Sequence, residues 1–208
     1  MSQGRLITIE GLDGAGKTTL AQSLLDALRA RGVDAELLRE PGGVAAAERI
    51  RDLVKDPRLH VVPRAEALLY AAARAQLVEE ALAPALERGR WILLDRFVDS
   101  SLAYQGGGRG LGIVDVGEIN AFATGELRPD RTLLLRVDPR VGRARRDDRG
   151  EEPDRLERER DTFFADVAEV YEILAEDEPE RFRVLDANAD PPAVLAQALA
   201  ALEDLLPG

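Results

Sequence analysis

The sequence predicts an α/β fold in which a five-stranded parallel sheet carries helices on both of its faces. Short apolar runs alternate with amphipathic helical patterns along the chain, and this order is typical of a parallel sheet. The run at 90–95 is apolar almost throughout, as in a strand that is buried on both sides. A glycine-rich loop joins the first strand to the first helix.

The expected strands are short and are separated by helical segments. The first is the apolar run at 6–9, directly before the glycine-rich loop. The second, at 35–39, ends in a Pro-Gly-Gly turn at the edge of the sheet where ligands of such folds bind. The other three strands are expected at 90–95, 132–137 and 181–186.

Helical patterns fill the segments between the strands. The first helix follows the glycine-rich loop, with its leucines on one side. Pro84 should kink or restart the long helix that contains it, and Gly150 and Pro153 break a densely charged segment. We find no internal repeat or linker, so we expect a single domain over residues 1–208. The further helices are expected at 44–56, 64–88, 114–126 and 192–206, with broken helical stretches within 140–160.

The 208-residue chain has an ordinary globular composition, with 45% hydrophobic and 32% charged residues. No apolar run is long enough to span a bilayer, and the N-terminus leads directly into a strand. We therefore expect a cytoplasmic protein with no membrane partner. The chain has no cysteine, which excludes disulfides, thiol catalysis and zinc–thiolate sites. A net charge of −11 argues against a nucleic-acid partner.

The stretch GLDGAGKTT at 11–19 carries the strongest functional signal. It matches the pattern G-x-x-x-x-G-K-[ST] and lies between a strand and a helix, the context that this phosphate-binding motif requires. Its glycines let successive backbone N–H groups point into one concavity, and the helix N-terminus adds partial positive charge. Lys17 can reach the outer phosphates, and the Thr18 hydroxyl can bind a magnesium ion. The expected ATP-binding residues are Gly11, Leu12, Asp13, Gly14, Ala15, Gly16, Lys17, Thr18 and Thr19.

A phosphate loop alone does not define a reaction. A glycine-rich turn can also join a strand to a helix and bind nothing, but the full spacing and both flanks favour a site for ATP or GTP. Neither Asn120 nor Asn188 is followed by lysine, so the guanine motif of GTPases is missing, as is the LSGGQ signature of transporter ATPases. The remaining activity is phosphoryl transfer to a small acceptor, which requires positioning and charge neutralisation.

Charged residues follow two of the expected strands, beside the phosphate loop. Asp95 can hold a magnesium ion and Arg96 can brace a phosphate, although an ordinary surface ion pair would have the same sequence.

Tyr70 and Arg74 share one helix face, where the ring can stack on a base and the guanidinium can donate to the base edge. On its own, such a pair is more often a core aromatic beside a solvated arginine.

The arginines between 140 and 149 alternate with acidic residues, which is typical of a solvated helix surface. The pair Arg149-Gly150 lies at a break between two helical stretches and is the better candidate for a mobile lid, expected at about 140–155. Such a lid can bring an arginine onto the transferred phosphate and exclude water. We expect His60 in an exposed loop and Trp91 in the core.

Six motifs follow one another along the chain. They are GLDGAGKTT at 11–19, REPGG at 39–43, YAAARAQLVE from Tyr70, LDR at 94–96, DSSLAYQGGGRG at 99–110 and RGEEPDRLE from Arg149. Together they resemble the thymidylate kinases, which phosphorylate dTMP with ATP, and the resemblance covers most of the chain. It implies the P-loop kinase fold of nucleoside monophosphate kinases, a short helical lid, Mg²⁺ with ATP as the phosphoryl donor, and a homodimer packed through helices.

The resemblance assigns roles to the matched residues around ATP. Lys17 and Thr18 serve the ATP phosphates and the magnesium ion, and Asp13 lies near the metal and the sugar of the acceptor. Arg96 braces the acceptor phosphate. The implied catalytic residues are Lys17, Arg96, Arg149 and Asp13, and the implied metal ligands are Thr18, Asp95 and Asp13.

The resemblance also assigns the residues around dTMP. Tyr70 takes the place of an aromatic residue, more often phenylalanine, that stacks on thymine. Arg74 contacts the carbonyl edge of the base, and Ser101 lies near a ring nitrogen. Tyr104 crowds the 2′ position and so favours deoxyribose. The implied substrate-binding residues are Arg39, Pro41, Tyr70, Arg74, Arg96, Ser101, Tyr104 and Gln105.

Gly14 places the chain in a subgroup of this family. Some members carry an arginine at this position, and those with glycine resemble the bacterial type, whose catalytic arginine comes from the lid. Arg149 matches that lid position. The lid has one residue more after Gly150 than the family pattern, and Arg145 or Arg146 could share the role.

Two other functions stay open from the sequence alone. A different small-molecule kinase on the same scaffold would act on another nucleotide or on a nucleoside. A nucleotide-dependent switch would bind ATP without transferring phosphate to a small acceptor, and the acceptor residues Tyr70, Arg74 and Tyr104 argue against it.

Overall fold

The computed structural model describes residues 4–147 and 152–206 of the chain. Five strands form one sheet in the order β2-β3-β1-β4-β5, and all neighbouring strands are parallel. The predicted α/β class and the five-stranded parallel sheet are therefore confirmed. The strands are β1 (Arg5–Gly11), β2 (Ala35–Arg39), β3 (Trp91–Asp95), β4 (Arg131–Arg136) and β5 (Phe182–Asp186).

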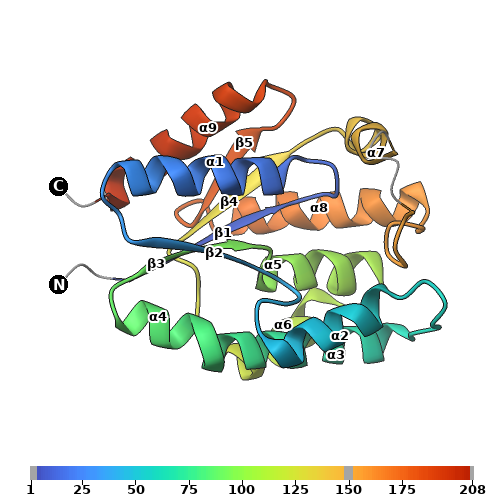
Figure 1. The fold of residues 1–208 in the computed structure, drawn as a ribbon. Coiled ribbons are helices and arrows are strands. Elements are labelled where there is room, and N and C mark those ends of the chain that lie inside the picture. The colour runs from blue at the N-terminus through green and yellow to red at the C-terminus, as the bar shows by residue number, and fades with distance from the viewer. Residues whose placement is uncertain (1–3, 148–151, 207–208) are drawn as a thin grey trace.

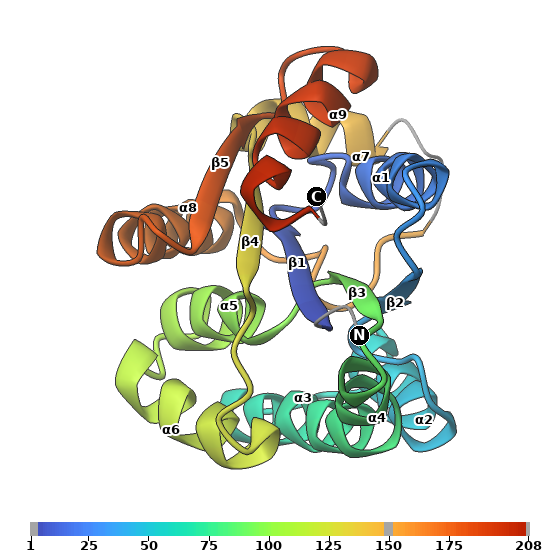
Figure 2. The same cartoon turned by 90° about the vertical axis from the view of Figure 1, so that its left-hand side faces the viewer.

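Nine α-helices surround the sheet in the described residues. The helices α1 and α9 cover one face, while α8, α5 and the helices that follow β2 cover the other (Figures 1 and 2). In the part of the chain that is described, no helix is both long and apolar enough to cross a bilayer. The helices are α1 (Lys17–Ala30), α2 (Ala45–Lys55), α3 (Pro63–Leu77), α4 (Ala83–Glu87), α5 (Val98–Ser101), α6 (Ile113–Thr124), α7 (Pro139–Asp147), α8 (Asp161–Asp177) and α9 (Pro191–Ala200).

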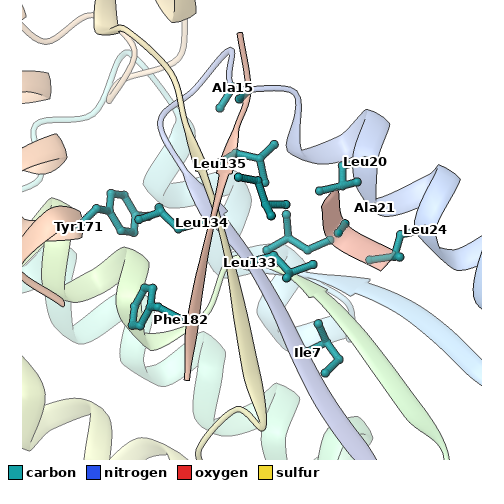
Figure 3. Close-up of a cluster of buried hydrophobic side chains, with 14 of the residues drawn as sticks. Ile7, Ala15, Leu20, Ala21, Leu24, Leu133, Leu134, Leu135, Tyr171 and Phe182 are labelled. Carbon is teal, nitrogen blue, oxygen red and sulfur yellow. The ribbon is translucent and has the colours of Figure 1, made fainter. Parts of the chain in front are cut away.

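The core follows the alternation of side chains along the strands. On β4, Leu133 and Leu135 point toward Leu20 of α1, whereas Leu134 points toward Tyr171 of α8 (Figure 3). These side chains are almost fully buried. Burial of each leucine contributes about 1.5–3 kcal/mol, so the two helix layers are held firmly against the sheet.

The central strand β1 brings the phosphate loop to the loop after β3. Ile9 of β1 lies opposite Asp95 of β3 in the parallel register, and the backbone N–H of Arg96 donates to the Ile9 carbonyl at 3.0 Å. The two strands therefore end side by side. This register places the motifs at 11–19 and 94–96 at the same edge of the sheet, where β1 turns into α1 (Figure 1).

The long helix predicted at 64–88 is interrupted, as expected from its proline. It consists of α3, a π-helical turn at Val78–Leu82, and α4, which has Pro84 in its first turn. Proline has no N–H and its ring crowds the carbonyl of the residue four positions earlier, so a regular α-helix cannot continue through it. His60 is exposed and Trp91 is buried, as predicted.

The structure differs from the prediction between 98 and 177. The segment around the glycine-rich motif is helical, with α5 followed by a π-helical turn at Leu102–Gly108. A side-chain carbon at Gly108 would come within 2.5 Å of the Phe163 ring, so the glycines here let the turn pack directly on α8. Between 140 and 160 the sequence predicts helical stretches broken at Gly150 and Pro153; α7 accounts for the described part up to Asp147, but residues 152–160 form turns and irregular backbone in place of a second stretch. The helix α8 itself was not predicted.

Candidate active site

The phosphate loop has the backbone that its glycines allow. Gly11, Gly14 and Gly16 all have positive φ, at 133°, 83° and 93°, and α1 begins at the next residue, Lys17. Residues other than glycine rarely adopt these backbone angles, and the angles let the loop curl tightly around the N-terminus of α1. Its N–H groups and the helix dipole together create a site for an anion.

Lys17 is folded back onto the loop. Its Nζ donates to the carbonyls of Gly11 and Leu12 at 3.1 and 2.9 Å and lies 4.0 Å from Asp13 Oδ1. Burial, with repulsion from Arg96, lowers the pKa of Lys17 to about 8, although Asp13 acts in the opposite direction. The ammonium group is thus held close to the loop by weak backbone acceptors, which an incoming phosphate can replace.

Gly14 lies directly against α7. A side-chain carbon at Gly14 would come within 1.9 Å of the Gly142 carbonyl oxygen, and one at Gly142 would come within 2.9 Å of the Asp13 carbonyl. The loop and the first helix of the predicted lid therefore touch backbone to backbone. An arginine at position 14, as in the other subgroup, has no room in this arrangement.

Thr18 and Asp95 form a pair at the carboxyl edge of the sheet. The Thr18 hydroxyl donates to Asp95 Oδ2 at 3.3 Å. A hydroxyl and a carboxylate at this separation are the hard oxygen ligands that Mg²⁺ prefers, and Mg²⁺ usually retains several waters. The third predicted ligand, Asp13, has both carboxylate oxygens engaged, one with Arg96 and the other with the Tyr104 hydroxyl.

Arg96 is the centre of a cluster between the phosphate loop and α5. Its guanidinium donates to Asp13 Oδ1 at 2.6 Å, to the Gly11 carbonyl at 3.2 Å and to the Tyr104 hydroxyl at 3.2 Å, and it stacks on the Tyr104 ring at 4.9 Å. Burial by itself would raise the pKa of Asp13, but the Arg96 and Lys17 charges outweigh it and hold that pKa well below its usual range. Asp13 is therefore ionised and holds Arg96 in place.

One cavity collects the predicted acceptor residues from five separate segments. The phosphate loop, the turn after β2, the helix α3, the end of β3 and the helical segment after it each contribute to its wall. The cavity is lined by Asp13, Lys17, Thr18, Arg39, Pro41, Tyr70, Arg74, Asp95, Arg96, Ser101, Tyr104 and Gln105 among the predicted residues.

Arg74 is embedded in the wall of this cavity, with 1% of its surface exposed. It donates to Glu40 Oε2 at 2.5 and 2.8 Å, to Ser101 Oγ at 2.9 Å, to the Phe97 carbonyl at 2.9 Å and to Asn120 Oδ1. The sequence had left open a solvated arginine, and the structure excludes that alternative. A buried charge of this kind is tolerated only when it is fully paired.

Tyr70 and Arg39 reach the cavity in different ways. Burial raises the pKa of Tyr70 above its ordinary value, so its hydroxyl stays protonated beside the cavity. Arg39 lines the cavity, but its guanidinium pairs with Glu48 at 3.0 Å and is largely exposed. Arg39 would have to leave this partner in order to bind a substrate.

Sequence reasoning missed several residues of the cavity wall. Arg51 donates to the Pro41 carbonyl at 2.8 Å, and Lys55 forms an ion pair with Asp154 at 2.9 Å. Arg51 and Lys55 are four residues apart in a predicted helix, and this spacing could have placed both cations on one face. The missed lining residues are Glu40, Arg51, Lys55, Ser100, Asp154 and Leu156.

A second cavity lies on the other side of the phosphate loop. Arg145 of α7 contributes the one charged side chain that lines it within the described residues, and donates to the Ala187 carbonyl at 2.8 Å. Small and apolar residues make up most of the wall. The cavity is lined by Gly14, Ala15, Gly16, Thr19, Leu20, Ser23, Leu135, Arg145, Ala187, Ala189, Pro191 and Val194.

The predicted lid can be followed only in part. Arg149, the predicted catalytic arginine, and Gly150 lie outside the described residues. On one side of them α7 touches the phosphate loop. On the other side, Asp154 reaches Lys55 of α2, and Arg155 lies 2.6 Å from Glu66 of α3. The α7 end of the lid therefore lines the second cavity through Arg145, and the other end lines the first cavity through Asp154.

Comparison with known proteins identifies the family. A sequence profile of the thymidylate kinases matches residues 9–198. The chain belongs to the thymidylate kinase family. It is 48% identical to the thymidylate kinase of Alkalilimnicola ehrlichii over 99% of this chain and 94% of that protein. It is also 48% identical to the thymidylate kinase of Deinococcus radiodurans, over 98% of each chain.

The fold of the thymidylate kinase family is also found in solved structures. A crystal structure of thymidylate kinase from Ehrlichia chaffeensis superposes with a TM-score of 0.79 at 27% sequence identity, covering 97% of this chain and 99% of that chain. The resemblance drawn from the six motifs, the P-loop kinase fold and the enzyme class, a dTMP kinase, are thereby confirmed.

Proposed function

We propose that this chain transfers the γ-phosphoryl group of Mg-ATP to the phosphate of dTMP, giving dTDP and ADP. The observation that carries the proposal is the position of the phosphate loop between two cavities, one lined by the acceptor residues and the other by small apolar residues. Two nucleotides held on either side of the loop meet at Lys17. We assign the whole reaction to one domain, with residues 140–155 as its lid.

On the ATP side, the loop amides and Lys17 bind the phosphates, since an anion replaces the weak backbone acceptors that now hold the ammonium group. Thr18 and Asp95 are the residues that would hold Mg²⁺, and their hydroxyl and carboxylate oxygens fit this ion. When bound with ATP, Mg²⁺ neutralises the charge that develops on the phosphates. Asp13 lies nearby and orients Arg96.

On the acceptor side, Tyr70 stacks on the thymine ring, and Arg74 and Ser101 face its polar edge. Tyr104 lies over the sugar, with Gln105 beside it, and Arg96 receives the phosphate. Each of these side chains is buried or half-buried in the cavity wall, so the ordering entropy of most of them is already lost before dTMP binds. Pro41 and Arg39 close the cavity from the turn after β2.

A panel of acceptors tests this proposal. ADP release is measured in a coupled assay with dTMP, dUMP, dCMP, AMP and thymidine at fixed Mg-ATP. We expect dTMP to give the highest kcat/KM. Faster turnover of another acceptor would assign the site to a different nucleotide or nucleoside. ADP release that does not depend on any acceptor would indicate a nucleotide switch.

The lid arginine is tested separately. An arginine that reaches the transferred phosphoryl group is worth about 10³-fold or more in turnover, so Arg149→Ala should lower kcat by at least this factor while the Kd for dTMP stays within about twofold. Arg140→Ala is the matched control, because Arg140 is exposed at the start of the same charged segment. Near-normal turnover of Arg149→Ala would move the role to Arg145 or Arg146.

The proposal includes a homodimer. The helices α2, α3 and α6 lie next to one another (Figure 2) and expose apolar side chains, including Leu68, Val114 and Phe122, the last with 93% of its surface exposed. A second copy of this chain, packed on these helices, would remove them from water. Sedimentation should give a dimer that Phe122→Glu dissociates, and a monomeric parent protein would contradict this. We place the enzyme in the cytoplasm, where its two nucleotide substrates occur.

A further inference from the structure

Glu10 is a buried carboxylate that the proposed reaction does not use. It lies near the end of β1, directly before the phosphate loop, with 0% of its surface exposed. Three donors reach it: the Phe97 backbone N–H at 2.7 Å on Oε1, and the Ser100 and Tyr171 hydroxyls at 2.6 and 2.8 Å on Oε2. Burying a carboxylate costs free energy unless donors satisfy it, and these three donors do so.

Ser100 connects Glu10 to Arg96. The Ser100 hydroxyl has one hydrogen to donate, and it lies 2.6 Å from Glu10 Oε2. An ionised carboxylate can only accept, so the hydrogen is directed toward Glu10. The lone pairs of the same oxygen then face Arg96, whose Nη1 donates to it at 3.0 Å. Glu10 thus determines that Ser100 is an acceptor for Arg96.

Arg96 depends on such side-chain partners because its backbone is in an unfavourable region. Its φ is 72°, which non-glycine residues adopt only when the surroundings hold them there. The next residue, Phe97, is fixed by its N–H bond to the same Glu10 carboxylate. Glu10 therefore contacts the segment that carries Arg96 at two points, one on the backbone and one on a side chain.

We propose that Glu10 is a positioning residue for the acceptor phosphate: acting through Ser100 and the Phe97 backbone, it holds Arg96 in the orientation that receives dTMP. This inference rests on the proposed role of Arg96 in binding the dTMP phosphate. It joins the strand that precedes the phosphate loop to the acceptor site, so the two halves of the active site share one buried anchor.

Glu10→Gln tests the proposal with little change in shape. Glutamine keeps one acceptor oxygen and must turn its NH₂ group either toward the Phe97 N–H or toward the Ser100 and Tyr171 hydroxyls, so either the backbone contact or the Ser100 link to the segment of Arg96 is lost. Losing a hydrogen bond to a charged group typically changes an equilibrium about tenfold, and we expect the Kd for dTMP to rise by about this factor. Thymidine has no phosphate, so its Kd should stay within about twofold, as should the Kd for ATP.

The measurements are made by calorimetry at pH 8, because burial, reinforced by the Asp99 charge, raises the pKa of Glu10 to about 7. Tyr171→Phe is the matched control. It removes a donor to the same carboxylate and the 3.0 Å contact between the Tyr171 and Ser100 hydroxyls. It leaves the Ser100–Glu10 and Arg96–Ser100 hydrogen bonds, so binding of dTMP should change by less than about twofold. Ser100→Ala should reproduce the effect of Glu10→Gln, and it carries the test if Glu10→Gln does not fold.

A double-mutant cycle separates positioning from a general structural effect. In the background of Arg96→Gln, the further change Glu10→Gln should leave the Kd for dTMP unchanged, because the residue through which it acts is gone. Equal losses of dTMP, thymidine and ATP binding, or additive effects in the cycle, would overturn the inference. A parent protein that does not bind dTMP would instead refute the proposed function.

Discussion

The two cavities beside the phosphate loop are lined by different kinds of side chain. The acceptor cavity is lined by charged and aromatic side chains. Two of its arginines are held by carboxylates in the protein, Arg74 by the buried Glu40 and Arg96 by the half-buried Asp13. The cavity on the opposite side is lined mainly by glycine, alanine and other small residues, with Arg145 as its one charge among the described residues.

From this difference we propose that the site divides recognition between side chains and backbone. Phosphates on the loop are bound by amides, which every residue provides, so small side chains serve mainly to let the backbone approach. A particular base and sugar must be selected by donors and rings in fixed positions. The acceptor side should therefore be sensitive to single substitutions. The opposite side should be tolerant except at the loop glycines Gly14 and Gly16, whose positive φ disfavours a side chain.

The largest effect is expected from Arg74→Met. Removing this guanidinium leaves Glu40 buried without its charge partner, which typically destabilises a protein by about 3–5 kcal/mol. Burial already raises the pKa of Glu40, and the Arg74 charge opposes this shift, so Glu40 should become protonated in the variant. The free energy of unfolding in urea measures the loss, and the KM for dTMP should rise at the same time.

The double variant Arg74→Met with Glu40→Leu separates the two effects. With both charges removed, much of the unfolding free energy should return, because no unpaired charge stays buried. The KM for dTMP should remain high if Arg74 reads the base. Recovery of the KM together with stability would mean that Arg74 is structural only.

Lys17→Met should have the next largest effect, since Lys17 lies where the two cavities meet. Loss of one preorganised donor to the transferred phosphate typically costs about 10²–10³ in kcat, or roughly 3–4 kcal/mol. The unfolding free energy should change little, because the partners of Lys17 are carbonyls with other possible donors. A stopped-assay comparison of kcat for Lys17→Met and the parent checks this, and a loss below tenfold would contradict it.

The contrast between the cavities also explains which parts could be predicted from the sequence. The strands were predicted to within about two residues because apolar runs end at turn residues or charged ends, as at 90–95. The acceptor residues, such as Tyr70, Arg74 and Tyr104, belong to sequence motifs that contain characteristic aromatic and charged residues. The small residues of the other cavity, such as Ala187 and Ala189, form no recognisable motif, so only the loop itself and the candidate lid residue Arg145 were predicted there.

Long-range partners could not be predicted from the sequence. Glu40, Asn120 and Ser101 all converge on Arg74, although they are 34, 46 and 27 residues away from it. No local pattern encodes such a meeting. The helix α8 is a different case, because Phe163, Val167 and Val170 are spaced as on one helix face and would have predicted it.

A moderate effect is expected from pH on ATP binding alone. The pKa of Lys17 is lowered to about 8, so the free enzyme loses its ammonium charge as the pH rises through this value. Bound phosphate requires the charged form, so ATP binding should weaken about tenfold between pH 7 and 9, with about fivefold of this loss between pH 8 and 9. Calorimetry at pH 7, 8 and 9 measures it, with Lys17→Arg as a control that should be flat. The Kd for dTMP should change much less.

The smallest effect is expected from Arg145→Ala, in the cavity that is lined mainly by small residues. Arg145 is exposed and donates to the Ala187 carbonyl, so its contribution to a bound base is a partly solvated stacking contact worth about 0.5–1 kcal/mol. We expect the KM for ATP to rise about three- to fivefold, with kcat and the KM for dTMP unchanged. A drop in kcat of more than thirtyfold would show that Arg145 acts on the transferred phosphate. The cavity lined by small residues would then contain a catalytic group, and the proposed division between side-chain and backbone recognition would no longer hold.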